Sequence, residues 1–205
     1  MDLTSMTSEE RTRVELVLAA VGARGFAGVF VPDRHAALAK VLELIPKGAG
    51  VAHGTSTTLE EIGFVERMRR PDSGYRYLND EWRAENDAAK RGRLRARLSV
   101  EADVYLGSVQ AVCETGEALG ADQSGSRQAF YTYGPPRVIW VAGTNKIVPD
   151  VAAGIRRIRE VALPKEDARM KATGAPGSSV GKLVIYERER PGRITLILVG
   201  ESLGF

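Results

Sequence analysis

Residues 51–63 read Val51-Ala52-His53-Gly54-Thr55-Ser56-Thr57-Thr58-Leu59-Glu60-Glu61-Ile62-Gly63. An apolar run ends here in one glycine and four consecutive hydroxyl residues, and a helical pattern follows. Apolar runs that alternate with helical patterns are typical of β–α units, which build parallel sheets. The stretch therefore predicts a buried strand, a short polar loop and a helix.

The loop after this strand is a candidate anion site. Gly54 lets the backbone turn sharply and approach a ligand closely, and Thr55, Ser56, Thr57 and Thr58 supply hydroxyl donors. The first amide groups of a helix are unpaired and lie at the positive end of the helix dipole, where phosphate and carboxylate groups bind. We predict that these five residues bind such a ligand. Alternatively, Thr55 or Ser56 only caps the following helix.

Helices and strands alternate along the rest of the chain. Helices are predicted over residues 7–25, 38–45, 59–66, 80–97 and 149–164, and strands over residues 28–31, 48–52, 102–107, 137–143, 182–186 and 194–199. Successive β–α units predict an α/β fold, with a mostly parallel sheet flanked by helices. We expect an N-terminal helix (residues 1–25) and one α/β domain (residues 26–205).

A second polar segment contains two carboxylates, Glu114 and Glu117, three residues apart. If they lie in a hairpin-like loop, one carboxylate is a candidate base or nucleophile and the other a candidate acid, provided that their surroundings separate their pKa values. Asp122 and Arg127 follow in the same segment and are candidate ligand-binding residues. The alternative is a simple turn with solvated acids.

A third polar cluster, Asn145 and Lys146, follows the predicted strand 137–143. The Asn145 amide is a candidate hydrogen-bond partner for a ligand, and Lys146 is a candidate cation for an anion. Ligands of parallel sheets bind beyond the carboxyl ends of the strands. We therefore expect the hydroxyl loop, the Glu114 segment and Lys146 to converge on one cleft.

The net charge argues neither for nor against an acidic partner unless the charge is clustered, and the one cluster does not favour a nucleic-acid partner. The formal net charge is +3 over 205 residues, and basic residues cluster only at residues 90–97. This run closes a helix that begins with acidic residues, so compensation of the helix dipole explains its position. It lacks the interleaved aromatic residues of single-strand binding platforms. Alternatively, one or two of these arginines reach into a site and bind an anion.

Residue usage limits other classes of function. Cys113 is the single cysteine and the chain has two histidines, so we expect no internal disulfide and no metal site. No apolar run approaches the roughly 20 residues that span a bilayer, and residues 1–10 are polar and acidic, without a basic region followed by an apolar core. We expect a cytoplasmic protein without a membrane span. The sequence does not identify a cofactor.

Taken in order, five segments resemble the LUD domain family, whose lactate-utilisation members are of the LutC and YkgG type. The segments are Gly54-Thr55-Ser56-Thr57-Thr58-Leu59-Glu60-Glu61-Ile62-Gly63, Glu114-Thr115-Gly116, Gly134-Pro135-Pro136-Arg137-Val138-Ile139, Gly143-Thr144-Asn145-Lys146-Ile147-Val148 and Gly200-Glu201-Ser202-Leu203-Gly204-Phe205. The resemblance covers the chain from about residue 45 onward. Members of the family often carry a cysteine-rich segment before the final strands, but residues 172–181 contain no cysteine.

The resemblance implies a fold similar to that of sugar-phosphate isomerases and CoA transferases (the NagB/RpiA type). It also implies a role in lactate or organic-acid oxidation, beside iron–sulfur oxidoreductase subunits. Three functions stay open at this point. The protein binds a small anionic ligand as an accessory subunit, or it is an isomerase- or acyl/CoA-transferase-like enzyme that uses Glu114 or Glu117, or it is an interaction module without a ligand. The sequence also leaves open whether the protein forms a homo-oligomer.

Overall fold

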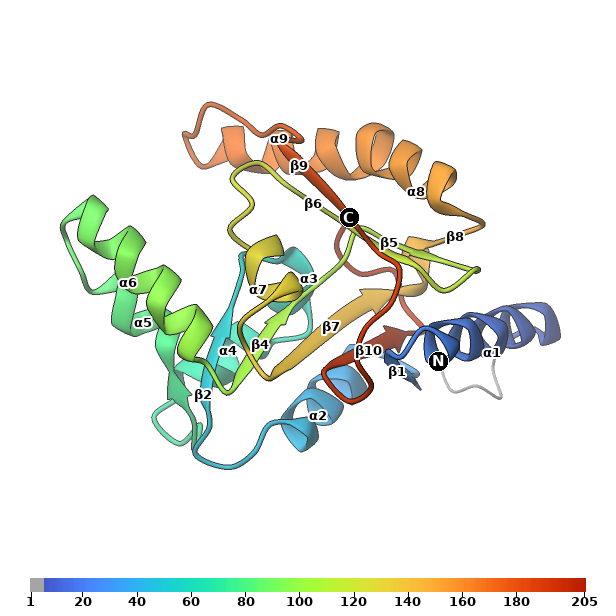
Figure 1. Cartoon of the computed structure of the whole chain (residues 1–205), viewed down its shortest axis with the longest axis horizontal. Helices are drawn as coiled ribbons and strands as arrows, with labels where there is room; N and C mark the ends of the chain where they lie inside the picture. The colour runs from blue at the N-terminus through green and yellow to red at the C-terminus, as the bar shows by residue number, and fades with distance from the viewer. Residues whose placement is uncertain (1–5) are drawn as a thin grey trace.

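Six parallel strands form the main sheet of the protein (Figure 1). The structure is a computed structural model that describes residues 6–205. In sheet order the strands are β1 (Ala27–Val31), β10 (Ile194–Val199), β7 (Arg137–Gly143), β4 (Val104–Gly107), β2 (Gly50–His53) and β3 (Arg76–Tyr77). Each strand pairs with its neighbours in the parallel sense. The predicted α/β class with a mostly parallel sheet is confirmed.

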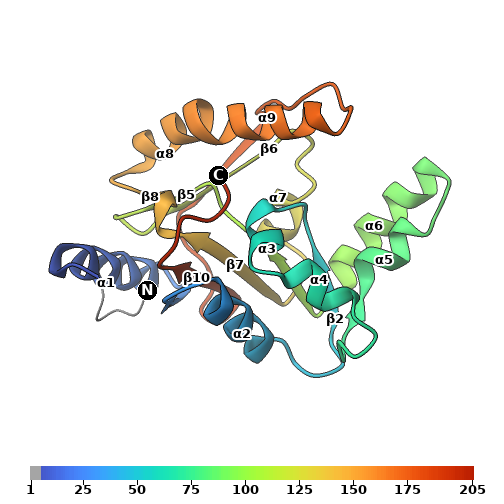
Figure 2. The same cartoon turned by 180° about the vertical axis from the view of Figure 1, so that it is seen from behind.

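Apolar side chains cover both faces of this sheet. In β7, Val138 and Trp140 belong to one core and Ile139 and Val141 to the other. Strands buried on both faces read as continuous apolar runs, which is why the sequence revealed them. One face packs against α2 (Arg34–Leu44), α3 (Thr57–Glu61) and α4 (Phe64–Arg69), seen from behind in Figure 2, and the other against α1 (Ser8–Ala23), α5 (Leu78–Arg83), α6 (Ala88–Glu101) and α7 (Gln128–Thr132).

A second, smaller sheet lies beyond the carboxyl ends of the main sheet (Figure 1). Its strands in order are β8 (Ile147–Val148), β5 (Ala111–Cys113), β6 (Ala118–Asp122) and β9 (Lys182–Tyr186). A long helical segment covers it, composed of α8 (Val151–Arg157), a π-helical turn (Ile158–Ala162) and α9 (Leu163–Ala172). The last two strands of the chain thus belong to different sheets.

The helix expected to stop at Pro164 does not stop there. Helical structure continues to Ala172, so this boundary was wrong. Pro164 falls in the first turn of α9, where a missing N–H is tolerated, and the π-helical turn directly precedes it. The predicted helix over residues 80–97 was also wrong in its bounds, since two helices stand in its place. The first, α5, ends at Arg83, and the Asp87 side chain accepts a hydrogen bond from the Lys90 amide (2.9 Å) and caps the start of the second, α6.

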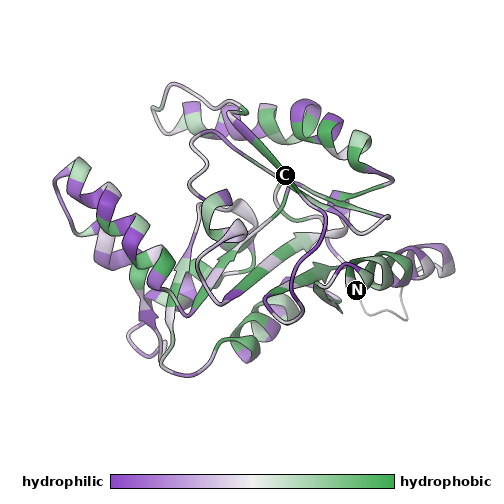
Figure 3. Cartoon of the chain, viewed as in Figure 1, coloured by the Kyte–Doolittle hydropathy of each residue, from purple (hydrophilic) through white to green (hydrophobic). Residues whose placement is uncertain are grey.

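Helix α1 belongs to the main core. Thr7 and Glu10 form a capping box at its start, and Val14, Val17 and Val21 are buried. The predicted N-terminal helix included residues 1–5, which lie outside the described residues. Strands of the main sheet are mainly hydrophobic, whereas α6 is mainly hydrophilic (Figure 3). Among the described helices, none is long and apolar enough to cross a membrane.

Candidate functional site

A cavity of about 220 Å³ lies between the two sheets. Its floor is formed by segments that follow the carboxyl ends of main-sheet strands: Thr55 to Thr58 after β2, Ser108 to Gln110 after β4, and Lys146 after β7. Carboxyl ends of parallel strands meet at one edge of a sheet, and ligands of such folds bind there. The position of the cavity therefore follows from the topology.

The hydroxyl loop lies in the cavity wall and also starts α3. Thr55, Ser56, Thr57 and Thr58 all line the cavity. The Ser56 hydroxyl accepts a hydrogen bond from the Leu59 amide (3.3 Å), so Ser56 is the N-cap of α3. Helix capping, the alternative to ligand binding that the sequence left open, is therefore observed for Ser56. Thr55, Thr57 and Thr58 are not the N-cap of α3.

Lys146 is a buried cation that lines the cavity. Its side chain is 1% exposed, and its ammonium donates to Thr58 Oγ1 (3.0 Å) and Ser108 Oγ (2.9 Å). Burial is the main cause that lowers the pKa of Lys146 to about 7; the charges of Arg157 and Arg127 act in the same direction, and Glu61 opposes them. Within residues 6–205, Lys146 forms no ion pair with a carboxylate. A buried charge without a counter-ion is costly, which suits a site that receives an anion.

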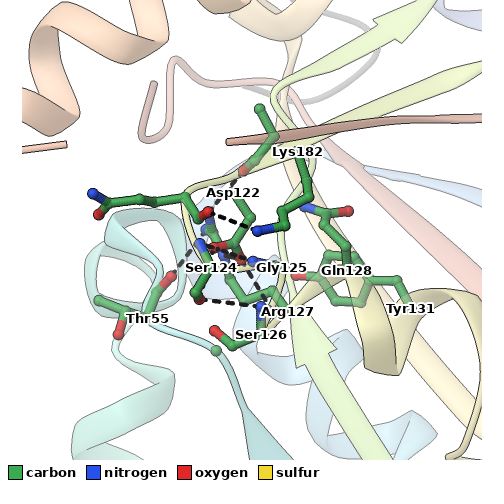
Figure 4. Close-up of polar contacts among 12 residues, drawn as sticks. Thr55, Asp122, Ser124, Gly125, Ser126, Arg127, Gln128, Tyr131 and Lys182 are labelled. Carbon is green, nitrogen blue, oxygen red and sulfur yellow. Dashed lines mark hydrogen bonds and ion pairs between the residues drawn. The ribbon is translucent and has the colours of Figure 1, made fainter. Parts of the chain in front are cut away.

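Arg127 is the second cation of the cavity, and Asp122 orients it (Figure 4). The Asp122 carboxylate accepts bonds from Arg127 Nε and from the Arg127 amide (both 3.1 Å). The other end of the guanidinium donates to the carbonyls of Thr55 (3.2 Å) and Ala121 (3.0 Å). Burial alone would raise the pKa of Asp122, but the charge and hydrogen bonds of Arg127 bring this pKa below its usual value.

Gly54 makes room for Arg127. A Cβ atom at position 54 would lie 2.3 Å from Arg127 Cγ and 2.5 Å from Cδ. We expected this glycine to serve a sharp turn or a close approach to the ligand. Its backbone does not adopt a positive φ, so the space for the arginine is the reason that a side chain is excluded.

The opposite wall of the cavity is apolar with a charged rim. Residues of the long helical segment and of the C-terminal segment line it, namely Ile158, Ala162, Leu163, Met170 and Phe205. At the rim, Arg169 pairs with Glu166 through two hydrogen bonds of 2.8 and 2.7 Å. The cavity is thus divided into a polar, cationic floor and an apolar roof.

Asn145 does not line the cavity, although its neighbour Lys146 does. The Asn145 side chain accepts a bond from the Leu203 amide (3.1 Å) and donates to the Gly204 carbonyl (3.4 Å). It thereby holds the segment that carries Phe205 against the cavity. Asn145 acts on the shape of the site, and its contacts are with the protein.

Glu114 and Glu117 do not converge with the other predicted residues. They lie in the turn between β5 and β6, which is the hairpin considered from the sequence. Glu114 pairs with Arg13 (2.7 Å), and Glu117 pairs with Arg24. Arg13 lies in α1 and Arg24 is its C-cap. These ion pairs hold both carboxylates against α1, and neither glutamate lines the cavity. The expected single cleft therefore contains the hydroxyl loop and Lys146 without the two glutamates.

Sequence reasoning missed several residues of the cavity. Ser108 and Gln110 directly follow the strand β4, so the rule that located Lys146 could have found them. Arg95 lines the cavity, donates to Ser126 Oγ (3.3 Å) and lies over the Trp82 ring. Arg95 was not missed entirely, because the alternative left open from the sequence was that one or two arginines of the basic run reach a site. Phe205 lies in the last of the five segments that resemble the family, but nothing in that segment indicated that it lines a cavity.

His53 and Cys113 are structural in their contacts. His53 Nδ1 donates to the Gly54 carbonyl (2.7 Å), so Nε2 accepts from the Tyr77 hydroxyl (2.6 Å). Burial lowers the pKa of His53 to about 4, which keeps the ring neutral at pH 7. Burial raises the pKa of the Cys113 thiol to about 12. Among the described residues, no group of three His, Cys, Asp or Glu side chains is placed to hold a metal ion.

Fold and site together define an α/β protein with a small cationic cavity at the carboxyl edge of a parallel sheet. The LUD domain family model matches residues 14–199, and the chain belongs to this family. Its structure is similar to a crystal structure of a DUF162 family protein from Deinococcus radiodurans, with a TM-score of 0.53 and 14% identity over 95% of this chain and 99% of that chain. No curated protein matches the chain significantly.

Proposed function

We propose that the protein binds a small anionic ligand, a carboxylate or a phosphate, in the cavity between the two sheets. The observation that carries the proposal is the buried ammonium of Lys146, which contacts two hydroxyl groups and, within residues 6–205, no carboxylate. Arg127 supplies a second, oriented cation in the same cavity. An anion bound there would compensate the charge that the fold has buried.

Membership of the LUD domain family supports a place for this binding step in the utilisation of lactate or a related organic acid. Under this proposal, an iron–sulfur oxidoreductase is the partner that performs the redox chemistry. An isomerase- or CoA-transferase-like reaction that uses Glu114 or Glu117 gains no support, because Arg13 and Arg24 hold these carboxylates outside the cavity wall. The proposal is made without them.

Titration calorimetry with acetate, lactate, sulfate and phosphate at pH 6.5 tests the proposal. We expect at least one of these anions to bind, and Lys146→Met to weaken that binding by roughly 10- to 100-fold, the range for a hydrogen bond to a charged group. Lys165→Met is the matched control, since Lys165 is exposed on α9 and does not line the cavity. Equal affinity in Lys146→Met, or no binding of any anion, would refute the proposal.

A further inference from the structure

We propose that Lys146 is a nucleophilic amine whose partner is a small oxo acid, with which it forms a covalent imine in the cavity. The inference rests on the proposed function, because it names the chemical class of the anion that the same cavity binds. It adds a carbonyl group next to the acid group of the ligand. It also gives Lys146 a chemical role in addition to its charge.

The surroundings of Lys146 fit an amine that reacts. Its ammonium contacts hydroxyl oxygens of Thr58 and Ser108, whereas a structural lysine usually pairs with a carboxylate. Burial, together with the charges of Arg157 and Arg127, lowers the pKa of Lys146 to about 7 although Glu61 opposes them, so the neutral amine is far more accessible at neutral pH than in an exposed lysine. A lysine desolvated beside other cations is the activated form of this nucleophile.

The flanking hydroxyls complete the chemistry. Lys146 Nζ attacks the carbonyl carbon, and the new N–C bond forms while the carbonyl oxygen takes up a proton. The C–O bond then breaks, and both amine protons leave with that oxygen as water. Thr58 and Ser108 lie within 3.0 Å of Nζ and within 3.4 Å of each other, so they can pass these protons. The step needs no oxidant or reductant.

The rest of the cavity selects an acid group and a short apolar chain. Arg127 has five N–H donors, of which bonds to Asp122, Thr55 and Ala121 use three. Two donors of this cavity-lining arginine therefore remain for a ligand carboxylate. Ile158, Leu163 and Met170 form the apolar roof. A volume of about 220 Å³ lies below the range of roughly 300–1,000 Å³ that holds drug-sized ligands. A short aliphatic oxo acid satisfies all of these features better than a phosphorylated sugar.

Reductive trapping tests the proposal on the whole chain. The protein is incubated with pyruvate, 2-oxohexanoate or glyceraldehyde 3-phosphate, cyanoborohydride is added, and peptide mass spectrometry locates the adduct. We expect an oxo acid to label Lys146 at least tenfold above the exposed Lys165. Lys146→Arg keeps a cation but removes this nucleophile, and we expect it to lose the label. Lys165→Met should leave labelling of Lys146 unchanged.

The outcomes separate this inference from the proposed function. If calorimetry shows that pyruvate or 2-oxohexanoate binds but trapping leaves Lys146 unlabelled, the imine is refuted and anion binding stands. Labelling of Lys165 as strongly as Lys146 also refutes it. Labelling by glyceraldehyde 3-phosphate with none by the oxo acids would overturn the assigned substrate class. If no anion binds at all, both proposals fail together.

Discussion

At the scale of single residues, the buried amine of Lys146 predicts that the proposed anion binding depends on pH. The pKa of Lys146 is about 7 in the free protein, because burial disfavours the charged form. An anion binds the protonated form, so affinity should be constant below pH 6 and fall toward tenfold per pH unit above pH 7. The other charged groups that act on this amine are Glu61, Arg127 and Arg157.

Sulfate is a suitable probe for this prediction, because its charge is constant between pH 6 and 9. Titration calorimetry across that range measures the affinity. We expect Lys146→Met to show weak binding that does not change with pH. A wild-type affinity that stays flat up to pH 9 would show that Lys146 is not the group that meets the anion.

Gly54 allows a second prediction about one residue. In Gly54→Ala the new methyl group would overlap the Arg127 side chain, which Asp122 holds in place. We expect sulfate affinity to fall more than tenfold and urea unfolding to show a loss of about 1–3 kcal/mol, the usual cost of an overpacked position.

Gly92→Ala is the matched control for this change. A methyl group there meets nothing within 4 Å, and position 92 lies inside α6. Stability should rise by up to about 1 kcal/mol because alanine favours the helix, and binding should not change. Wild-type affinity in Gly54→Ala would mean that the position of Arg127 does not matter for the ligand.

At the scale of elements, the two glutamates tie the β5–β6 hairpin to α1. The Glu117 side chain is 13% exposed and pairs with Arg24, whereas that of Glu114 is 39% exposed and pairs with Arg13. Glu117→Gln should therefore lower the free energy of unfolding by about 1–3 kcal/mol, and Glu114→Gln by about 1 kcal/mol or less. Urea unfolding measures both. Neither variant should change sulfate affinity, and a loss of binding in folded Glu117→Gln would contradict this placement.

The same two glutamates show what a sequence leaves undetermined. The apolar runs predicted the central strands β2, β4, β7 and β10, which are buried on both faces, and the polar residues after β2 and β7 predicted the cavity floor. Those signals are local. The pairing of Glu117 with Arg24 joins residues 93 positions apart, and no local pattern encodes it. For the same reason the sequences of β9 and β10 show the same kind of apolar run, although the two strands belong to different sheets.

On the scale of the whole molecule, the cavity exists only because two sheets meet. Lys146 and residues 55–58 follow strands of the main sheet, whereas Asp122 ends β6 of the smaller sheet and Arg127 lies in the segment after it, at the start of α7. A ligand that contacts both sides should therefore stabilise both against local opening. Hydrogen exchange with saturating sulfate measures this effect. We expect slower exchange in residues 55–58 and 122–127, and also in residues 200–205, which Asn145 holds at the cavity.

The β5–β6 turn at residues 114–117 is the internal control, because it belongs to the smaller sheet but lies outside the cavity wall. Its exchange should not change. Protection confined to residues 55–58 would mean that the anion binds to the hydroxyl loop alone. The smaller sheet would then make no contact with the ligand. Protection spread evenly over both sheets, with the turn included, would indicate global stabilisation by salt. Only protection at both walls, with an unchanged turn, fits a ligand held between Lys146 and Arg127.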